Sequence, residues 1–180
     1  MSILLIVWSH VNVVVSDSMY PIMERGDFVI VENAKYEFNP NDLKVGDIVV
    51  YRAHWPDYKQ NYAKYVVKIN NKSLVVFEGD ATKPVIHRII EKVELDGKTY
   101  YITKGDNNPT YDPELISQDQ IKQKIIEIGG NPLIIPYLGY ISIILKENLF
   151  LVLLLVGLWY AYDYLKNKRR QKEKNNMVDD

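Results

Sequence analysis

The sequence predicts a mainly β domain followed by a C-terminal transmembrane helix. Short runs of β-branched and aromatic residues, separated by Gly, Asn and Asp, recur along the first two thirds of the chain. An uncharged apolar stretch lies near the C-terminus, and a cluster of Lys and Arg follows it. The length of 180 residues suffices for one modest domain with its own core, but hardly for two.

The first fifteen residues form the least regular part of this pattern. The apolar run at residues 2–8 is interrupted by Ser9, His10 and Asn12, which leaves no uninterrupted stretch of membrane length. Residues 1–15 are therefore predicted to be an N-terminal strand or the remnant of a first membrane segment. We favour a short strand or helix end that packs on the domain.

Residues 16–145 carry the signals of a β-rich domain. The predicted strands cover residues 28–31, 48–51, 65–69, 74–77, 85–95 and 99–103. Asn70-Asn71 suits a tight turn, and Asp96-Gly97 is the strongest two-residue hairpin signal in the chain. A short polar helix is expected around residues 117–128, before the break at Gly129-Gly130.

The C-terminal part reads as a membrane anchor. Residues 149–162 contain no charge, and an extension through Leu165 brings the stretch to the lower edge of the roughly 17 to 25 residues that cross a bilayer. We predict a transmembrane helix over residues 146–165 and a basic cytoplasmic tail, disordered, over residues 166–180. The Lys and Arg cluster in that tail marks the cytoplasmic side, so the β-rich domain should face the non-cytoplasmic side.

Composition excludes several classes of function. The net charge is -1, which does not favour a polyanionic partner, so we expect no nucleic acid. The absence of cysteine excludes disulfides, a thiolate nucleophile and Cys-ligated zinc. His10 and His54 share no metal-ligand spacing with His87, and we predict neither a metal nor another cofactor.

Ser18 is the first candidate for chemistry. It lies where a predicted strand ends in small polar residues, shortly before Pro21, which disfavours continuation of the strand. A serine at such a boundary is usually a solvated turn residue, because an unassisted hydroxyl is a poor nucleophile near neutral pH. A catalytic role would need an adjacent base.

His87 could supply that base. Alternation along the strand over residues 85–95 puts it on the face of Val85, Ile89, Val93 and Leu95. A histidine on an apolar face is more often a core residue with satisfied hydrogen bonds. Its unperturbed pKa of about 6.5 nevertheless suits proton transfer near neutral pH.

Two carboxylates could orient such a base. Asp106 and Asp112 lie in the turn-rich stretch at residues 104–113, which directly follows a predicted strand. A loop with solvated acids is the plain interpretation. If either carboxylate reached His87, it would complete a nucleophile–base–orienter set in the chain order Ser, His, Asp. That order excludes the chymotrypsin, subtilisin and α/β-hydrolase folds.

Together these segments resemble the type I signal peptidase family, specifically its archaeal and endoplasmic-reticulum branch. Ser16-Asp17-Ser18-Met19-Tyr20-Pro21 is similar to the family's nucleophile box, and Ile86-His87-Arg88-Ile89 to the box in which this branch has His instead of Lys. Lys104-Gly105-Asp106-Asn107-Asn108, with Asp112, is similar to the third box. The likeness covers about residues 13–145, in the family's order.

The resemblance implies a fold, an activity and site residues. The fold is a signal-peptidase-like β-rich catalytic domain, and the activity is cleavage of signal peptides from exported preproteins after a small residue. Ser18 would be the nucleophile, His87 the general base, and Asp112 its acid partner, with Asp106 as a supporting or alternative acid. The oxyanion hole would comprise the Ser18 N–H and the Ser16 hydroxyl. Substrate contact is assigned to Met19, Tyr20 and Pro21.

The implied partners are signal peptides and membrane lipid, with the protein translocation machinery as a further candidate. The membrane would be the cell membrane or one of endoplasmic-reticulum type. Family members normally have a full transmembrane helix before the nucleophile box, and only about fifteen residues precede Ser16 here. Two alternatives stay open. One is a Ser/Lys self-cleaving repressor-type peptidase, and the other is a non-enzymatic, membrane-anchored β-domain that binds an exterior partner.

Overall fold

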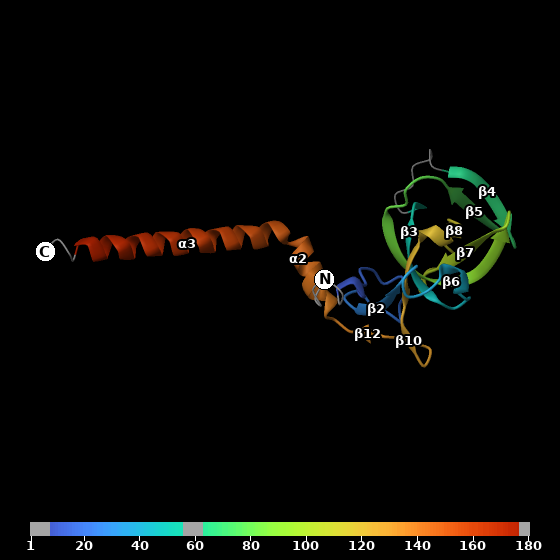
Figure 1. Cartoon of the computed structure of the whole chain (residues 1–180), viewed down its shortest axis with the longest axis horizontal. Helices are drawn as coiled ribbons and strands as arrows, with labels where there is room; N and C mark the ends of the chain where they lie inside the picture. The colour runs from blue at the N-terminus through green and yellow to red at the C-terminus, as the bar shows by residue number, and fades with distance from the viewer. Residues whose placement is uncertain (1–7, 56–62, 177–180) are drawn as a thin grey trace. The chain divides into compact units, whose positions relative to one another are not determined.

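The computed structural model describes residues 8–55 and 63–176, and it divides into two units, residues 1–140 and 141–180 (Figure 1). The first unit is mainly β, as the sequence predicted. Its strands are β1 (Val11–Val13), β2 (Phe28–Asn33), β3 (Ile48–Ala53), β4 (Ala63–Ile69), β5 (Lys72–Phe77), β6 (Lys83–Leu95), β7 (Lys98–Lys104), β8 (Ile116–Ser117), β9 (Ile121–Ile125), β10 (Glu127–Ile128), β11 (Asn131–Pro132) and β12 (Ile134–Ile135).

One large antiparallel sheet organises this unit. Its strand order is β1-β2-β9-β3-β6-β7-β8, and β12 also pairs with β2. Strands β4 and β5 form a separate hairpin, as do β10 and β11. The two predicted tight turns are present, and both residues of each turn have positive φ, as Asn and Gly tolerate. The order β3-β6-β7 sets three strands side by side, and the candidate site is built on them.

The predicted helix around residues 117–128 is wrong. A short 3₁₀ turn, η4 (Gln118–Gln120), is followed directly by strand β9, which pairs with both β2 and β3. Ile121 and Ile125 are both buried in β9. A spacing of four residues puts two side chains on one face of a strand as well as of a helix, so the sequence pattern fits both. The two neighbouring strands decide in favour of β structure.

Three apolar clusters form the core. The first includes Val14, Met19 and Met23, and it fixes the chain on both sides of Ser18. The second lies under β3 and β6 and includes Tyr51 and Ile89. The third underlies the β4–β5 hairpin and includes Leu74, Val76, Ile102 and Leu115, with Val93 and Leu95 of β6 packed against it.

Strand β6 contributes to all three clusters: Ile86 packs against the first, Ile89 belongs to the second, and Val93 and Leu95 pack against the third. Its pairing with β7 shifts register between Ile89 and Glu91. The irregularity changes the face presented by the residues that follow it. His87 and Ile89 are buried, and Ile89 belongs to the second cluster. The expectation that Val93 and Leu95 share their face is wrong, since both pack against the third cluster.

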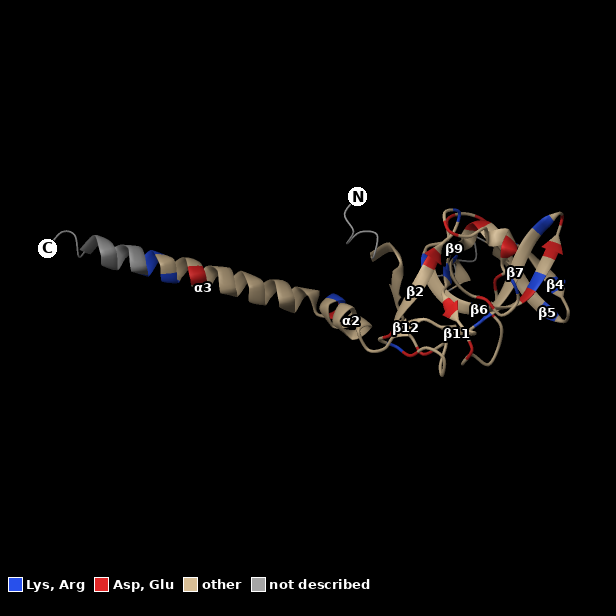
Figure 2. Cartoon of the chain, turned by 60° about the horizontal axis from the view of Figure 1, so that its bottom comes forward, with Lys and Arg blue, Asp and Glu red and all other residues tan. Residues whose placement is uncertain are grey.

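The second unit is helical. Helix α2 (Gly139–Glu147) leads to α3 (Leu149–Asn176), of which Leu149–Arg169 is long and apolar enough to cross a membrane. Figure 2 shows that the first part of α3 is free of charged residues and that Lys and Arg follow it. The expected disorder of the tail is wrong for its backbone through Asn176. Lys, Arg, Gln and Glu are good helix formers, and they continue the apolar helix.

Candidate active site

Ser18 lies on a loop whose two flanks are anchored in the core. The Val14 amide donates to the Asp27 carbonyl at 2.9 Å. Met19 and Met23 are 1% and 0% exposed. Between these anchors the Tyr20 amide donates to the Asp17 carbonyl, which closes a tight turn around Ser18. The loop thus holds a half-buried serine hydroxyl in a defined position.

His87 lies in the middle of β6, opposite Val49 of β3. Its side chain is 3% exposed. The ring nitrogen Nε2 is 3.1 Å from Ser18 Oγ, and Nδ1 is 2.7 Å from Asp112 Oδ2. Both ring nitrogens therefore have hydrogen-bonding partners. With Nδ1 donating to the carboxylate, Nε2 is the nitrogen that can accept the serine proton.

Asp112 enters the site from the segment between β7 and β8. Its amide donates to the Thr103 carbonyl at 2.8 Å, which fixes this part of the segment against β7. The carboxylate is 3% exposed, and its Oδ2 accepts from the Tyr51 hydroxyl at 2.8 Å. Thr103 Oγ1 is 2.7 Å from the same oxygen. A buried carboxylate is tolerated where several donors face it, as they do here.

Tyr51 and Thr103 are the site residues that sequence reasoning missed. They come from β3 and β7, the two strands that flank β6, and both are fully buried. Burial raises the pKa of the Tyr51 phenol well above its usual range, and the Asp112 carboxylate adds to this effect. The phenol therefore stays protonated and donates at any physiological pH. The only signal in the sequence was a hydroxyl-bearing side chain at a position of each strand that faces the interior.

Asp106 is not in contact with His87. Its two carboxylate oxygens accept from Arg88 Nε and Nη2 at 2.9 and 2.7 Å, and Arg88 Nη1 also donates to the Gly46 carbonyl. The hydrogen bonds to Asp106 raise the pKa of the Arg88 guanidinium. The structure therefore gives Asp106 a structural setting and brings only Asp112 to the histidine.

The loop after β7 also holds the serine loop directly. The Asn107 amide donates to the Ser18 carbonyl at 2.9 Å, and Asn107 Nδ2 donates to the Asp17 carbonyl at 3.0 Å. A Cβ on Gly105 would lie 2.6 Å from the Ser18 carbonyl oxygen and 2.8 Å from His87 Nε2. This close approach explains why glycine is needed there.

The other predicted site residues lie around Ser18. Ser16 Oγ is 3.2 Å from Ser18 Oγ. Tyr20 and Pro21 are exposed and available to a ligand. Met19 is buried, and its packing in the first apolar cluster gives it an anchoring place instead of the expected substrate contact.

Among residues 8–55 and 63–176, no three His, Asp or Glu side chains come together as a possible metal site. His10 contacts Glu37 at 2.6 Å, and His54 contacts Glu114 at 2.6 Å. Each of these two histidines thus contacts a carboxylate other than Asp112. The chemistry that the arrangement allows is proton transfer from Ser18 to His87, with Asp112 orienting the imidazole. This is the arrangement of an activated serine nucleophile.

Comparison with known proteins shows which proteins this chain is similar to. The chain is similar to an uncharacterized protein of Methanocaldococcus jannaschii, with 53% identity over 94% of this chain and 100% of that protein. It is also similar to the signal peptidase complex catalytic subunit SEC11 of Debaryomyces hansenii, with 31% identity over 89% of this chain and 80% of the relative. SEC11 of Candida tropicalis is 31% identical over 83% of this chain and 74% of the relative.

The profile described as "Signal peptidase, peptidase S26" matches residues 1–128. This range includes the serine loop, β6 and the segment that carries Asp112. The chain therefore belongs to the S26 family of signal peptidases.

Proposed function

We propose that this protein is a membrane-anchored serine endopeptidase that removes N-terminal signal peptides from exported preproteins. Membership of the S26 family and the likeness to the catalytic subunit SEC11 support this class of reaction. The observation that carries the proposal is the continuous contact from Ser18 Oγ through His87 to Asp112, at 3.1 and 2.7 Å. A non-enzymatic domain would have no need for a hydroxyl, an imidazole and a buried carboxylate in this order.

In the first step His87 Nε2 takes the Ser18 proton while Ser18 Oγ attacks the scissile carbonyl carbon. Asp112 keeps the second ring proton on Nδ1 and stabilises the imidazolium. The imidazolium then gives its proton to the leaving amine as the C–N bond breaks, and the signal peptide remains as an acyl group on Ser18. Tyr51 and Thr103 hold the Asp112 carboxylate in place throughout.

Water completes the cycle. His87 takes a proton from a water molecule, the resulting hydroxide attacks the acyl carbon, and Ser18 Oγ leaves with the proton from His87. The Ser18 N–H and the Ser16 hydroxyl are the proposed donors to the oxyanion, an interaction worth about 2.7–4 kcal/mol per donor in acyl-transfer enzymes. Tyr20 and Pro21, exposed beside Ser18, are the proposed contacts to the substrate chain.

The apolar part of α3 would hold the enzyme in the membrane where signal peptides are found. The Lys and Arg that follow it support a cytoplasmic C-terminus, with the peptidase domain on the opposite side. The preference for a small residue before the cleaved bond and contact with the translocation machinery are further parts of the proposal.

Covalent labelling tests the nucleophile. The full chain in detergent micelles is treated with a serine-directed acylating inhibitor, and the modified peptide is identified by mass spectrometry. We expect one adduct on Ser18, its loss in Ser18→Ala, and strongly slowed labelling in His87→Ala. Ser73→Ala, which removes an exposed hydroxyl on β5, is the matched control and should label normally. Equal labelling of Ser18→Ala would contradict the proposed nucleophile.

A further inference from the structure

The imidazole of His87 lies near two aromatic rings. Trp55, two residues beyond the end of β3, has its ring centroid 6.4 Å from that of His87, with an angle of 20° between the planes. Tyr51 approaches the same imidazole edge-on, at 6.5 Å and 62°. A near-parallel ring and a steeply inclined ring close to the imidazole restrict its rotation. Trp55 also packs against the second apolar cluster.

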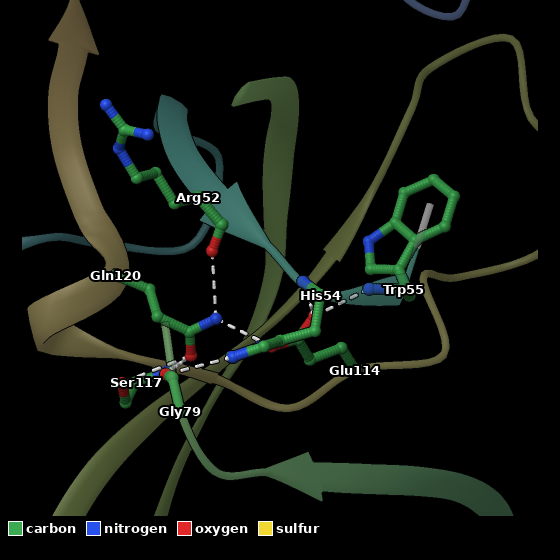
Figure 3. A network of polar contacts seen from close by, with 7 residues as sticks. All are labelled: Arg52, His54, Trp55, Gly79, Glu114, Ser117 and Gln120. Atoms are coloured by element: carbon green, nitrogen blue, oxygen red, sulfur yellow. Dashed lines mark hydrogen bonds and ion pairs between the residues drawn. The ribbon is translucent and has the colours of Figure 1, made fainter. Parts of the chain in front are cut away.

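The backbone that carries Trp55 extends beyond the paired part of β3, whose ladder with β6 ends at Ala53. Beyond Ala53 the backbone amides donate to a carboxylate instead of to a neighbouring strand. Glu114 Oε2 accepts from the His54 amide at 2.8 Å and from the Trp55 amide at 3.3 Å (Figure 3). The main chain of the tryptophan is therefore fixed by a side chain from a distant segment.

The other carboxylate oxygen of Glu114 also has hydrogen-bonding partners. Oε1 contacts His54 Nδ1 and accepts from Gln120 Nε2, both at 2.6 Å, as Figure 3 shows. His54 Nε2 faces the Gly79 carbonyl at 3.2 Å. Both ring nitrogens of His54 thus face oxygen atoms. The hydrogen bonds from the two amides and from Gln120 offset the cost of burying the Glu114 carboxylate, which is 1% exposed.

One short segment supplies both acids. Asp112 contacts His87, and two residues later Glu114 holds the backbone of Trp55. The segment is fixed to its neighbours by main-chain bonds, since the Leu115 amide donates to Val75 and the Val75 amide to Pro113. The base and the ring stacked on it therefore depend on the same stretch of chain.

We infer that Trp55 is a positioning residue that keeps the His87 imidazole aligned with Ser18, and that Glu114 acts through it. This inference rests on the proposed function. The stacked ring limits imidazole rotation while the base exchanges protons with Ser18 and the leaving amine. Glu114, with His54, keeps the ring in place. Misalignment of about 1 Å in an active site can cost roughly 100-fold in rate.

The test compares Trp55→Leu, which keeps apolar bulk without a planar ring, with Trp55→Phe. The full chain in detergent micelles cleaves a synthetic signal peptide with alanine before the scissile bond. We expect Trp55→Leu to lower kcat by roughly 10- to 100-fold with KM unchanged. Trp55→Phe should keep most of the activity, because the phenyl ring keeps an aromatic face beside the imidazole.

Glu114 is tested by a double-mutant cycle. Glu114→Gln keeps an oxygen for the two amides but replaces the oxygen that faces His54 Nδ1 and Gln120 Nε2 by an amide NH₂. It should lower kcat in the same direction as Trp55→Leu. If Glu114 acts through Trp55, the double variant should have the kcat of Trp55→Leu alone. Losses that simply multiply would overturn that part of the inference.

NMR of the histidine-labelled chain gives a readout independent of activity. The chain has three histidines, and the His87 signals are assigned by their absence in His87→Ala. The stacked indole should shift the His87 ring protons upfield, and Trp55→Leu should remove this shift. Tyr36→Ala, which removes an exposed ring, is the control for loss of an aromatic residue.

The outcomes separate this inference from the proposed function. Wild-type kcat in folded Trp55→Leu, equal losses in Trp55→Leu and Trp55→Phe, or unmoved His87 signals would each overturn the inference. In all three cases Ser18→Ala would still be inactive. Cleavage that survives Ser18→Ala would instead overturn the proposed function.

Discussion

Asp106 and Asp112 lie six residues apart in one segment, yet their surroundings differ completely. Asp112 is buried and contacts His87, Tyr51 and Thr103. Asp106 forms a paired contact with Arg88 and is 19% exposed. The same carboxylate group thus contacts an imidazole in one case and a guanidinium in the other. Two variants can separate these roles.

We predict that Asp112→Asn folds but is nearly inactive. The amide can still accept hydrogen bonds, but it lacks the charge that stabilises the imidazolium and favours the wrong tautomer of His87. The corresponding change in a well-studied triad lowers turnover by about 10⁴. Turnover and thermal unfolding of the variant are the measurements. An active Asp112→Asn would show that another group orients the base.

For Asp106→Asn we predict a loss of stability with less loss of activity. Loss of the charged bonds to Arg88 should lower the free energy of unfolding by roughly 1–3 kcal/mol, while more activity remains than in Asp112→Asn. Denaturant titration and turnover, measured on one preparation, give both quantities. A dead but fully stable Asp106→Asn would mean that this acid takes part in the chemistry.

Tyr51→Phe tests the donors to Asp112. The change removes only the hydroxyl that contacts Oδ2, and the ring continues to fill the core. We expect a stability loss of roughly 1–3 kcal/mol and a fall in kcat much smaller than that of Asp112→Asn, because Thr103 still contacts the carboxylate. A loss of activity as large as that of Asp112→Asn would mean that the phenol itself takes part in proton transfer.

Among the structural elements, two loops meet at the site. The loop after β7 contacts the serine loop through Asn107, and Gly105 is the point of closest approach. We predict that Gly105→Ala lowers activity by orders of magnitude, since its methyl group would force Ser18 and His87 apart. Gly157→Ala, at a position with open space around the glycine, is the control. Cleavage assays on both variants decide, and an active Gly105→Ala would show that the loops can separate without harm.

The sequence patterns predicted most of the strands, because alternation and turn residues act over a few neighbours. Asp96-Gly97 fixed the β6–β7 hairpin in this way. Ile121 and Ile125 were ambiguous, and only their pairing with β2 and β3 made them part of a strand. The register shift after Ile89 was equally hidden, since it arises between β6 and β7 and not within β6.

Part of the candidate site could also be predicted from the sequence, because strands and turns leave local signals. Ser18, His87 and Asp112 each stand out beside turns or on a recognisable strand. Tyr51 and Thr103 do not, because nothing local distinguishes them from other strand residues. They are recognisable only once β3, β6 and β7 lie side by side. The contact of Trp55 with His87 likewise depends on tertiary packing.

For the whole molecule, the proposed orientation in the membrane rests on the Lys and Arg that follow the apolar part of α3. A reporter fused after Asp180 should be cytoplasmic, and one inserted at the exposed Asn70-Asn71 turn should be exterior. Protease accessibility of the two fusions in intact cells or vesicles measures this. Replacing the Lys and Arg after Leu165 by Gln should weaken the bias. The reverse pattern in the unchanged chain would contradict the proposed topology.

The most direct test of the central claim is cleavage of a preprotein by the purified full chain in detergent micelles. We expect a single cut after a small residue at the end of the signal peptide, identified by N-terminal sequencing of the product. Ser18→Ala and His87→Ala should each lower turnover by several powers of ten with nearly unchanged thermal unfolding, while Ser73→Ala cuts normally. Absence of cleavage by the folded wild-type chain, or normal cleavage by Ser18→Ala, would contradict the account.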